Sequence, residues 1–198
     1  MLIDTVSATP GMNQDRFFAT PVGRGVFVVV CDGAGGVNHG DLTAATVVRE
    51  LVQHAEVIGL DDLAALVAGM DKGLVLGAHG GETTCVAAWI TPLEVYGVSV
   101  GDSEAWWVGD SAIELTAQQS RARLGSGSAR VTSFRRLRAG GSVIVGTDGF
   151  FSYAPRERWL DLVRTSPTTT GVARRLLDLA RLPTGTLQDD ATVVVVTR

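Results

Sequence analysis

The sequence has few of the residues that several functional classes require. Its 198 residues include one lysine, two cysteines and three histidines, and the net charge at pH 7 is -4. A general nucleic-acid binder needs a basic face against the phosphates, so this charge argues against one. Two cysteines are too few for a cysteine-rich zinc site or a disulfide scaffold. Cys31 and Cys85 fall in apolar runs, and we expect both to be buried and reduced.

Long apolar segments are also missing. The longest runs, such as residues 26–31, are far shorter than the roughly 20 residues that span a bilayer. Asp4 interrupts the N-terminus before any apolar stretch develops, which argues against a signal peptide. A chain of this length suits one buried core better than two. We therefore expect a single domain over residues 1–198, located in the cytoplasm and without a membrane partner.

Short β-branched runs bounded by Gly, Pro or Asp predict the strands, and apolar residues at helical spacing predict the helices. The clearest strands are expected at 26–31, 83–90, 94–100, 105–108, 142–146 and 191–197. Less regular runs predict strands at 2–9, 17–21, 112–115 and 129–134. Helices are expected at 41–58, 61–76, 155–163 and 171–180, the second of them capped by Asp61. Helices grouped in pairs around mostly antiparallel strands indicate an α+β layered fold rather than a βαβ one.

Aspartates at the ends of predicted strands give the main functional signal. Asp32 and Asp148 each follow a buried run and precede glycine, and Asp102 lies in a turn between two strands. Asp189 and Asp190 stand directly before the last strand; adjacent side chains alternate, so we expect only one to face the site, with Asp190 pointing away. One Asp-Gly pair is a common turn. Several acids at one sheet edge repel each other unless a cation neutralises them, which indicates a hard-metal site.

Six short motifs in fixed order resemble those of the metal-dependent protein phosphatases of type 2C, including the bacterial serine/threonine phosphatases. They are Asn13-Gln14-Asp15, Asp32 to Gly36, Gly81-Glu82-Thr83-Thr84, Gly101 to Ser103, Thr147 to Gly149 and Asp189 to Thr192. Any one of them is weak, but together they span about residues 11 to 197. The resemblance implies a four-layer α-β-β-α sandwich, in which two antiparallel sheets pack face to face between pairs of helices.

The resemblance also implies a centre with two Mn²⁺ or Mg²⁺ ions, and a third in bacterial members. Asp32 would bridge two ions, and the Gly33 carbonyl would ligate one of them. Asp148 and Asp189 would hold the first ion, and Asp102 together with Asp148 would hold the third. No motif contains His or Cys, and oxygen-only ligation suits Mg²⁺ and Mn²⁺ better than Zn²⁺.

The implied reaction is hydrolysis of phosphoserine and phosphothreonine. A hydroxide that bridges the two ions would attack phosphorus in line, while the cations neutralise charge on the phosphoryl oxygens. Asp32 and Asp15 are the expected catalytic residues, with Asp15 orienting water rather than ligating a metal. The implied partner is a phosphorylated protein, the substrate of a cognate serine/threonine kinase.

The chain departs from the family pattern at three positions. Gln14 stands where many relatives have a metal-ligating Glu. It would be a weak metal ligand, or it would hold a water or another ligand without contacting the metal. Pro10 stands where many relatives have an arginine that grips the phosphate. Arg16 is a tentative substitute and Arg24 a second one, although a surface charge is the favoured interpretation of either. Ala34 replaces a histidine that some relatives use as an acid, and nearby His39 is more simply a surface or helix-start residue.

The segment expected to form a flap is short. Residues 118–128 carry Arg121 and Arg123, for which contact with a phosphopeptide is possible in principle but solvation is favoured. The departures leave two alternatives to a protein phosphatase. One is a catalytically weak relative that binds a phosphoprotein as a regulator. The other is a metal-dependent hydrolase of small phosphate esters.

Overall fold

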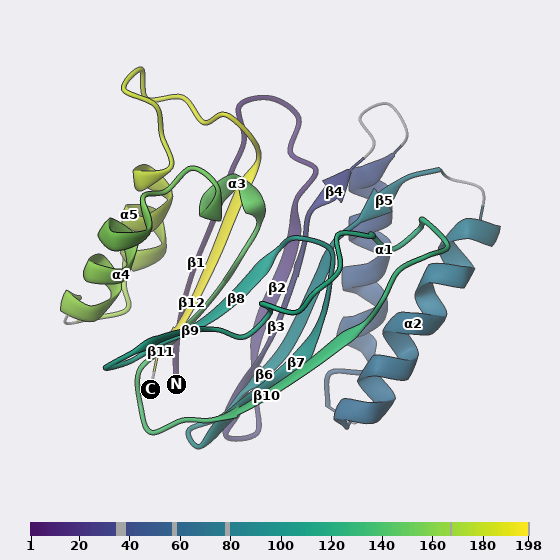
Figure 1. Cartoon of the computed structure of the whole chain (residues 1–198), viewed down its shortest axis with the longest axis horizontal. Helices are drawn as coiled ribbons and strands as arrows, with labels where there is room; N and C mark the ends of the chain where they lie inside the picture. Colours follow the sequence, from purple (N-terminus) through teal and green to yellow (C-terminus); the bar gives the residue numbers. More distant parts are fainter. Residues whose placement is uncertain (35–38, 57–58, 78–79, 167, 198) are drawn as a thin grey trace.

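Two five-stranded antiparallel sheets lie face to face at the centre of the protein (Figure 1). The computed structural model describes residues 1–34, 39–56, 59–77, 80–166 and 168–197. The first sheet contains, in spatial order, β1 (Leu2–Ala8), β12 (Ala191–Thr197), β11 (Ser142–Gly146), β8 (Glu104–Val108) and β9 (Ala112–Glu114). The second contains β10 (Thr132–Leu137), β7 (Glu94–Val100), β6 (Cys85–Ile90), β3 (Gly25–Cys31) and β2 (Arg16–Val22).

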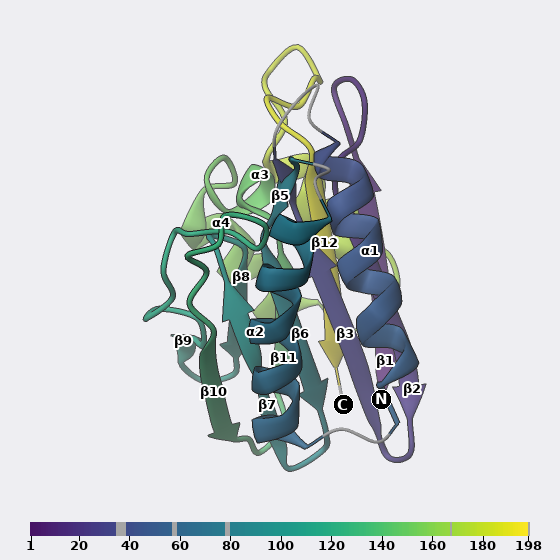
Figure 2. The same cartoon turned by 90° about the vertical axis from the view of Figure 1, so that its right-hand side faces the viewer.

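A pair of helices covers each outer face of the sandwich. α1 (Gly40–Gln53) and α2 (Leu60–Leu76) lie side by side over the second sheet (Figure 2). α4 (Arg156–Thr165) and α5 (Val172–Leu179) cover the first sheet on the opposite side (Figure 1). The short helix α3 (Asp148–Phe151) follows β11 directly. The four-layer α-β-β-α architecture predicted from the sequence is therefore confirmed.

The continuous apolar run of β3 is explained by burial on both of its faces. Val28 and Val30 point between the sheets and pack in the same cluster as Val145 of β11. Phe27 and Val29 point the other way and pack in the cluster under α1 and α2. Because successive side chains of a strand point to opposite faces, a strand between a sheet and a helix layer needs apolar residues at every position.

Local hydrogen bonds explain where the elements differ from prediction. The predicted strand 83–90 is divided into β5 (Glu82–Thr83) and β6, because the Thr84 N–H donates to the Asp32 carbonyl instead of continuing the strand ladder. β5 pairs with the two-residue strand β4 (Gly33–Ala34), which was not predicted.

Several predicted boundaries and one predicted cap also need correction. The helix expected at 41–58 ends at Gln53, and residues 57–58 lie outside the described part of the chain. The strand expected at 129–134 runs instead from Thr132 to Leu137. Gly59, not Asp61, is the N-cap of α2. α3 is a single turn too short to show helical spacing in the sequence.

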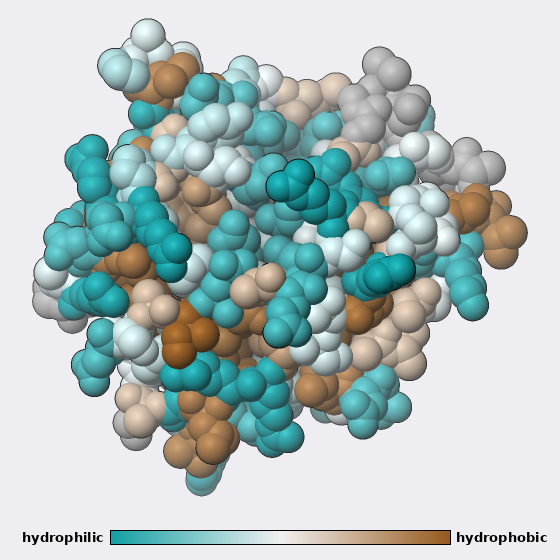
Figure 3. All heavy atoms as spheres, in the orientation of Figure 1, coloured by the Kyte–Doolittle hydropathy of each residue, from teal (hydrophilic) through white to brown (hydrophobic). Residues whose placement is uncertain are grey.

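The state of the cysteines agrees with the expectation from the sequence. Hydrophilic residues dominate the face in Figure 3, where hydrophobic residues form separate patches. Cys31 and Cys85 are free and buried, as predicted. Within the described ranges, no helix combines the length and the apolar character that crossing a membrane requires.

Candidate metal centre

Three of the predicted aspartates meet at one end of the sandwich. Asp32 follows β3, Asp102 lies in the turn between β7 and β8, and Asp148 begins α3 directly after β11. One carboxylate oxygen of each lies within 4.8 Å of the others. The two sheets thus contribute acids to a common site, which we call the acidic triad.

The backbone of Asp32 is held by the motif at residues 81–84. The Asp32 N–H donates to Thr84 Oγ1 at 2.8 Å, and the Asp32 carbonyl accepts from the Thr84 N–H and from Thr83 Oγ1, each at 2.9 Å. Thr84 Oγ1 also lies 2.6 Å from Ser103 Oγ, beside Asp102. One buried threonine therefore links the backbone at Asp32 to the turn that carries Asp102.

The electrostatics of the triad fit a divalent cation. Burial raises the pKa of Asp32 to about 8, and the charges of Asp15 and Asp148 contribute to the rise. Burial also raises the pKa of Asp148, with added repulsion from Asp102 and Asp189. Carboxylates that oppose ionisation in this way become favourable when a cation sits among them. All the donors are oxygen atoms, which suits Mg²⁺ or Mn²⁺.

Asp15 lies next to the triad and is almost fully buried. Its Oδ2 accepts hydrogen bonds from Thr147 Oγ1 at 2.9 Å and from Thr192 Oγ1 at 2.8 Å. Among the described residues, no donor reaches its Oδ1. Burial raises the pKa of Asp15 to about 7, and the charges of Asp190 and Asp148 contribute to the rise. The structure thus fixes one carboxylate oxygen and leaves the other able to accept a proton or a hydrogen bond.

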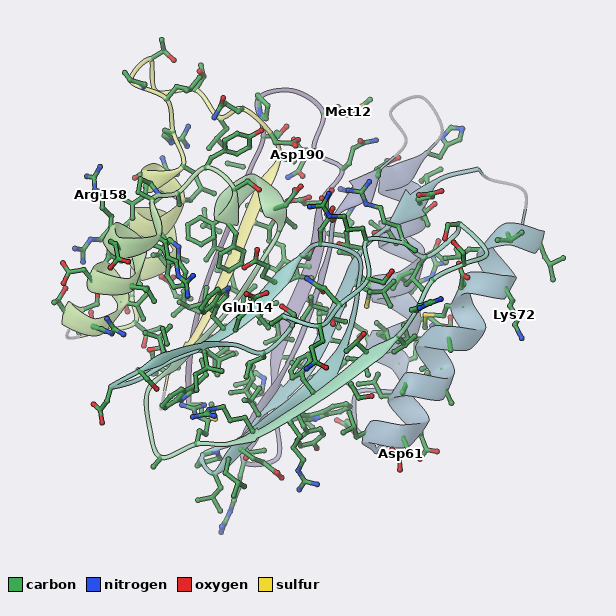
Figure 4. All side chains as sticks on the ribbon, viewed as in Figure 1. Met12, Asp61, Lys72, Glu114, Arg158 and Asp190 are labelled. Atoms are coloured by element: carbon green, nitrogen blue, oxygen red, sulfur yellow. The ribbon has the colours of Figure 1, made fainter. Side chains whose placement is uncertain are left out.

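The remaining acids of the last motif lie close to the triad but outside it. Asp190 Oδ2 accepts the Gln14 N–H at 2.6 Å, and the Asp190 N–H donates to Asp189 Oδ1 at 2.9 Å. Met12 lies in the loop between β1 and β2. Figure 4 shows Asp190 at the same end of the molecule as Met12. Asp189 is exposed, and its charge still acts on Asp148. The metal-ligating role of Asp189 and the weaker role of Gln14 remain predictions. Asp190 was expected to point away from the site, and this was wrong, because its carboxylate accepts the Gln14 N–H of the first motif.

Gly33 occupies a place with no room for a side chain. A Cβ there would lie 2.5 Å from the Gly40 carbonyl oxygen and 2.8 Å from the Gln14 carbonyl oxygen. Gly35 and Gly36, the end of the same motif, lie outside the described residues. His39 is the N-cap of α1, in agreement with the favoured interpretation as a helix-start residue. The role of the Gly33 carbonyl as a ligand stays a prediction.

Gly149→Ala is expected to destabilise the protein strongly. A Cβ at Gly149 would lie 1.9 Å from the Asp190 carbonyl oxygen, so α3 or the last motif would have to move. We expect a loss of about 2 kcal/mol or more in the free energy of unfolding, because overpacking of this kind costs roughly 1–3 kcal/mol. Urea unfolding followed by circular dichroism measures it.

Gly69→Ala is the matched control for this prediction. Gly69 lies within α2, and a Cβ there meets nothing within 4 Å. Alanine should therefore stabilise the helix by roughly 0.5–1 kcal/mol. Equal stabilities for the two alanine variants would contradict the packing described around Gly149.

Both arginines near the site have partners within the protein. Arg16 Nη1 donates to the carbonyls of Asn13 and Asp15, both at 2.8 Å, and its Nη2 lies 3.5 Å from Asp41 Oδ2. Its tentative role toward substrate remains a prediction. Arg123 was expected to be solvated, and this was wrong: its Nη2 lies 3.3 Å from both carboxylate oxygens of Asp102. No local pattern indicates this contact, because it depends on how residues 118–129 fold back over the triad.

Comparisons with known proteins support the fold. No protein-family model matches the chain, and no curated protein sequence matches it. Among solved structures, a bacterial serine phosphatase is 18% identical, with a TM-score of 0.85 and coverage of 100% of this chain and 97% of the other. Serine/threonine phosphatase Stp1 from Staphylococcus aureus is 18% identical, with a TM-score of 0.86 and coverage of 99% and 94%.

A third similar structure was solved with metal. The catalytic domain of serine/threonine protein phosphatase PstP, in complex with two manganese ions, is 21% identical to this chain, with a TM-score of 0.83 and coverage of 98% of this chain and 96% of the other. Similarity at these identities establishes the fold. The chain thus has the fold of bacterial serine/threonine phosphatases, and the predicted resemblance is confirmed at that level.

Proposed function

We propose that this protein is a metal-dependent serine/threonine protein phosphatase. The observation that carries the proposal is the acidic triad: Asp32, Asp102 and Asp148 come from three separate strand ends and place their carboxylates within 4.8 Å of one another. A cluster of this kind costs free energy in a protein that gives it no cation to bind. The shared fold with structures of bacterial serine/threonine phosphatases supports the same assignment.

The proposed cofactor is Mn²⁺ or Mg²⁺, as two ions with a site for a third. Asp32, Asp102 and Asp148 would hold them, with the Gly33 carbonyl and Asp189 as further ligands. When bound there, the ions would supply Lewis acidity, which lowers the pKa of a water and neutralises charge on the phosphoryl oxygens. The two manganese ions of the PstP structure support this choice of metal.

The chain's own residues would orient the reacting groups. Thr83 and Thr84 hydrogen-bond the backbone N–H and carbonyl of Asp32. These bonds fix the position of the backbone from which the Asp32 carboxylate extends. Asp15 is held through one oxygen by Thr147 and Thr192, so its other oxygen is free to accept a hydrogen bond from the attacking water. We propose that Asp15 orients this water and holds a proton as the reaction proceeds.

The proposed substrate is a protein that a cognate serine/threonine kinase has phosphorylated. The proposed location of both enzymes is the cytoplasm. The test compares hydrolysis of a phosphothreonine peptide and of p-nitrophenyl phosphate with Mn²⁺, with Mg²⁺ and with chelator. We expect metal-dependent hydrolysis of the peptide, abolished by chelator and in Asp148→Ala. No hydrolysis with either metal would support the regulatory alternative instead. Hydrolysis of the small ester but not of the peptide would support a small-ester hydrolase.

A further inference from the structure

The predicted flap of residues 118–128, which the structure extends to Ala129 and which we call the flap, is fastened to the body of the protein at several points. Leu124 is completely buried, and its N–H and carbonyl exchange hydrogen bonds of 2.9 and 3.0 Å with Thr83. Nearer the start of the flap, the Ser120 carbonyl accepts the Gly101 N–H at 3.1 Å, and Gln119 Nε2 donates to the Ser103 carbonyl at 2.9 Å. The flap is thus joined to both sides of the turn that carries Asp102.

A buried aspartate of α2 holds the other end of the flap. Asp71 is only 5% exposed. Its Oδ1 accepts the N–H groups of Gly125 at 2.8 Å and Gly127 at 3.1 Å, and its Oδ2 accepts the Ala129 N–H at 3.1 Å. Hydrogen bonds to a carboxylate are about twice as strong as neutral ones. A buried acid that accepts three backbone N–H groups of one loop fixes the path of that loop.

Arg123 lies in the chain between Ser120, which bonds to Gly101, and Gly125, which bonds to Asp71. Its guanidinium contacts Asp102 of the acidic triad. Its two hydrogen bonds to Asp102 are 3.3 Å long, beyond the usual range of roughly 2.7–3.2 Å. Among the described residues, its buried Nε has no acceptor. Its positive charge partly offsets the rise in the pKa values of Asp32 and Asp148 that burial causes. Much of the donor capacity of this guanidinium is therefore unused.

A phosphoryl group supplies the acceptors that Arg123 lacks. The planar guanidinium matches two phosphate oxygens at once, and a phosphate monoester offers three. Arg16, the other arginine near the site, already donates to two backbone carbonyls. Arg123 reaches the acidic triad from the flap, through its contact with Asp102.

We propose that Arg123 binds the phosphate of the substrate, and that Asp71 is the positioning residue that holds the flap so that Arg123 reaches it. This proposal rests on the proposed function and adds the group that recognises phosphate. Asp71 itself touches neither substrate nor metal. Its effect passes through the backbone at Gly125 and Gly127 to Arg123.

The first test measures phosphate recognition. In Arg123→Ala, we expect KM for the phosphothreonine peptide and the dissociation constant of inorganic phosphate, measured by calorimetry with Mn²⁺ bound, to rise about tenfold or more. The value of kcat should change far less, because the lost contact also exists in the bound substrate. Arg123→Lys should recover part of the affinity. Arg121→Ala removes the same charge from an exposed position of the flap and should leave both constants unchanged.

The second test measures the positioning role of Asp71 by amide hydrogen exchange, with and without metal. In Asp71→Asn, we expect faster exchange at Gly125, Gly127 and Ala129 together with a rise in KM. Asp61→Asn is the control, since Asp61 is exposed in the first turn of the same helix (Figure 4). A thermal unfolding midpoint within the range of this control would show that a general loss of folding does not explain the effect.

The outcomes separate this proposal from the proposed function. Phosphate binding in Arg123→Ala equal to that in Arg121→Ala would overturn the role of Arg123. Unchanged flap exchange, or an unchanged KM, in Asp71→Asn would overturn the positioning role. If the wild-type protein hydrolyses no ester, the proposed function fails, yet loss of phosphate binding in Arg123→Ala would still support the assignment of Arg123.

Discussion

Asp32→Asn is expected to reduce phosphatase activity severely while leaving the protein folded. Asparagine keeps the shape of the side chain, and the backbone bonds of Asp32 to Thr84 do not involve the carboxylate. The change removes the negative charge at the centre of the triad, and with it tight cation binding. We expect kcat/KM to fall by about a hundredfold to a thousandfold or more, the usual effect of removing one electrostatic contact in an active site. Steady-state hydrolysis of the phosphothreonine peptide with Mn²⁺ measures this loss.

Asp110→Asn is the matched control, because Asp110 is an aspartate just after β8 and is not part of the triad. Its activity and its metal affinity should equal those of the wild-type protein. If Asp32→Asn retains wild-type kcat/KM at saturating metal, the assignment of Asp32 is wrong. A variant that fails to fold would show itself as a lost circular dichroism signal rather than as a lost metal site.

In the metal-free protein, stability is expected to fall as the pH rises from about 4 to about 8. Folding raises the pKa of Asp32 from 3.8 to about 8 and that of Asp15 from 3.8 to about 7, mainly through burial. Between those values the folded state binds more protons than the unfolded state, so the free energy of unfolding decreases with pH. Each unit of pKa shift corresponds to about 1.4 kcal/mol. Urea unfolding in chelator across this range measures the slope.

Metal should reverse this dependence, since cations bind the ionised carboxylates and their binding releases protons. With Mn²⁺ present, we expect the increase in the unfolding midpoint to be larger at pH 8 than at pH 5. Asp32→Asn should show a flatter slope in chelator, because one of the two titrating acids is gone. A metal-free protein whose stability is constant or rises over the same interval would contradict the burial of these acids.

The sequence predicted the layered fold and the meeting of the aspartates for the same physical reason. An antiparallel strand that is buried on both faces must be apolar throughout, so its polar residues appear only where it ends. Asp32 and Asp148 could therefore be placed at strand ends, and stacking the two sheets brings those ends together. The order of the motifs added the expectation of a shared site, which no single Asp-Gly pair would have supported.

The contacts that the sequence did not predict depend on long-range packing. Arg123 was predicted to be solvated because nothing near it in the chain indicates a partner. In the structure the flap brings it to Asp102. The flap is held in turn by Asp71, which lies 54 residues before its partner Gly125. The interruption of the predicted strand 83–90 at Thr84 likewise depends on hydrogen bonds to Asp32, 52 residues earlier in the chain. Such contacts follow from the assembled fold and leave no periodic signal in the sequence.

Anomalous diffraction from crystals grown with Mn²⁺ would show directly whether the acidic triad binds metal, because it locates the cation independently of any assay. We expect strong anomalous peaks at the acidic triad, with carboxylate oxygens of Asp32 and Asp148 as ligands and Asp102 beside them. Crystals of Asp32→Asn should lose or weaken these peaks under the same conditions. Manganese bound elsewhere, with the triad empty in a protein that still hydrolyses the phosphopeptide, would contradict this expectation.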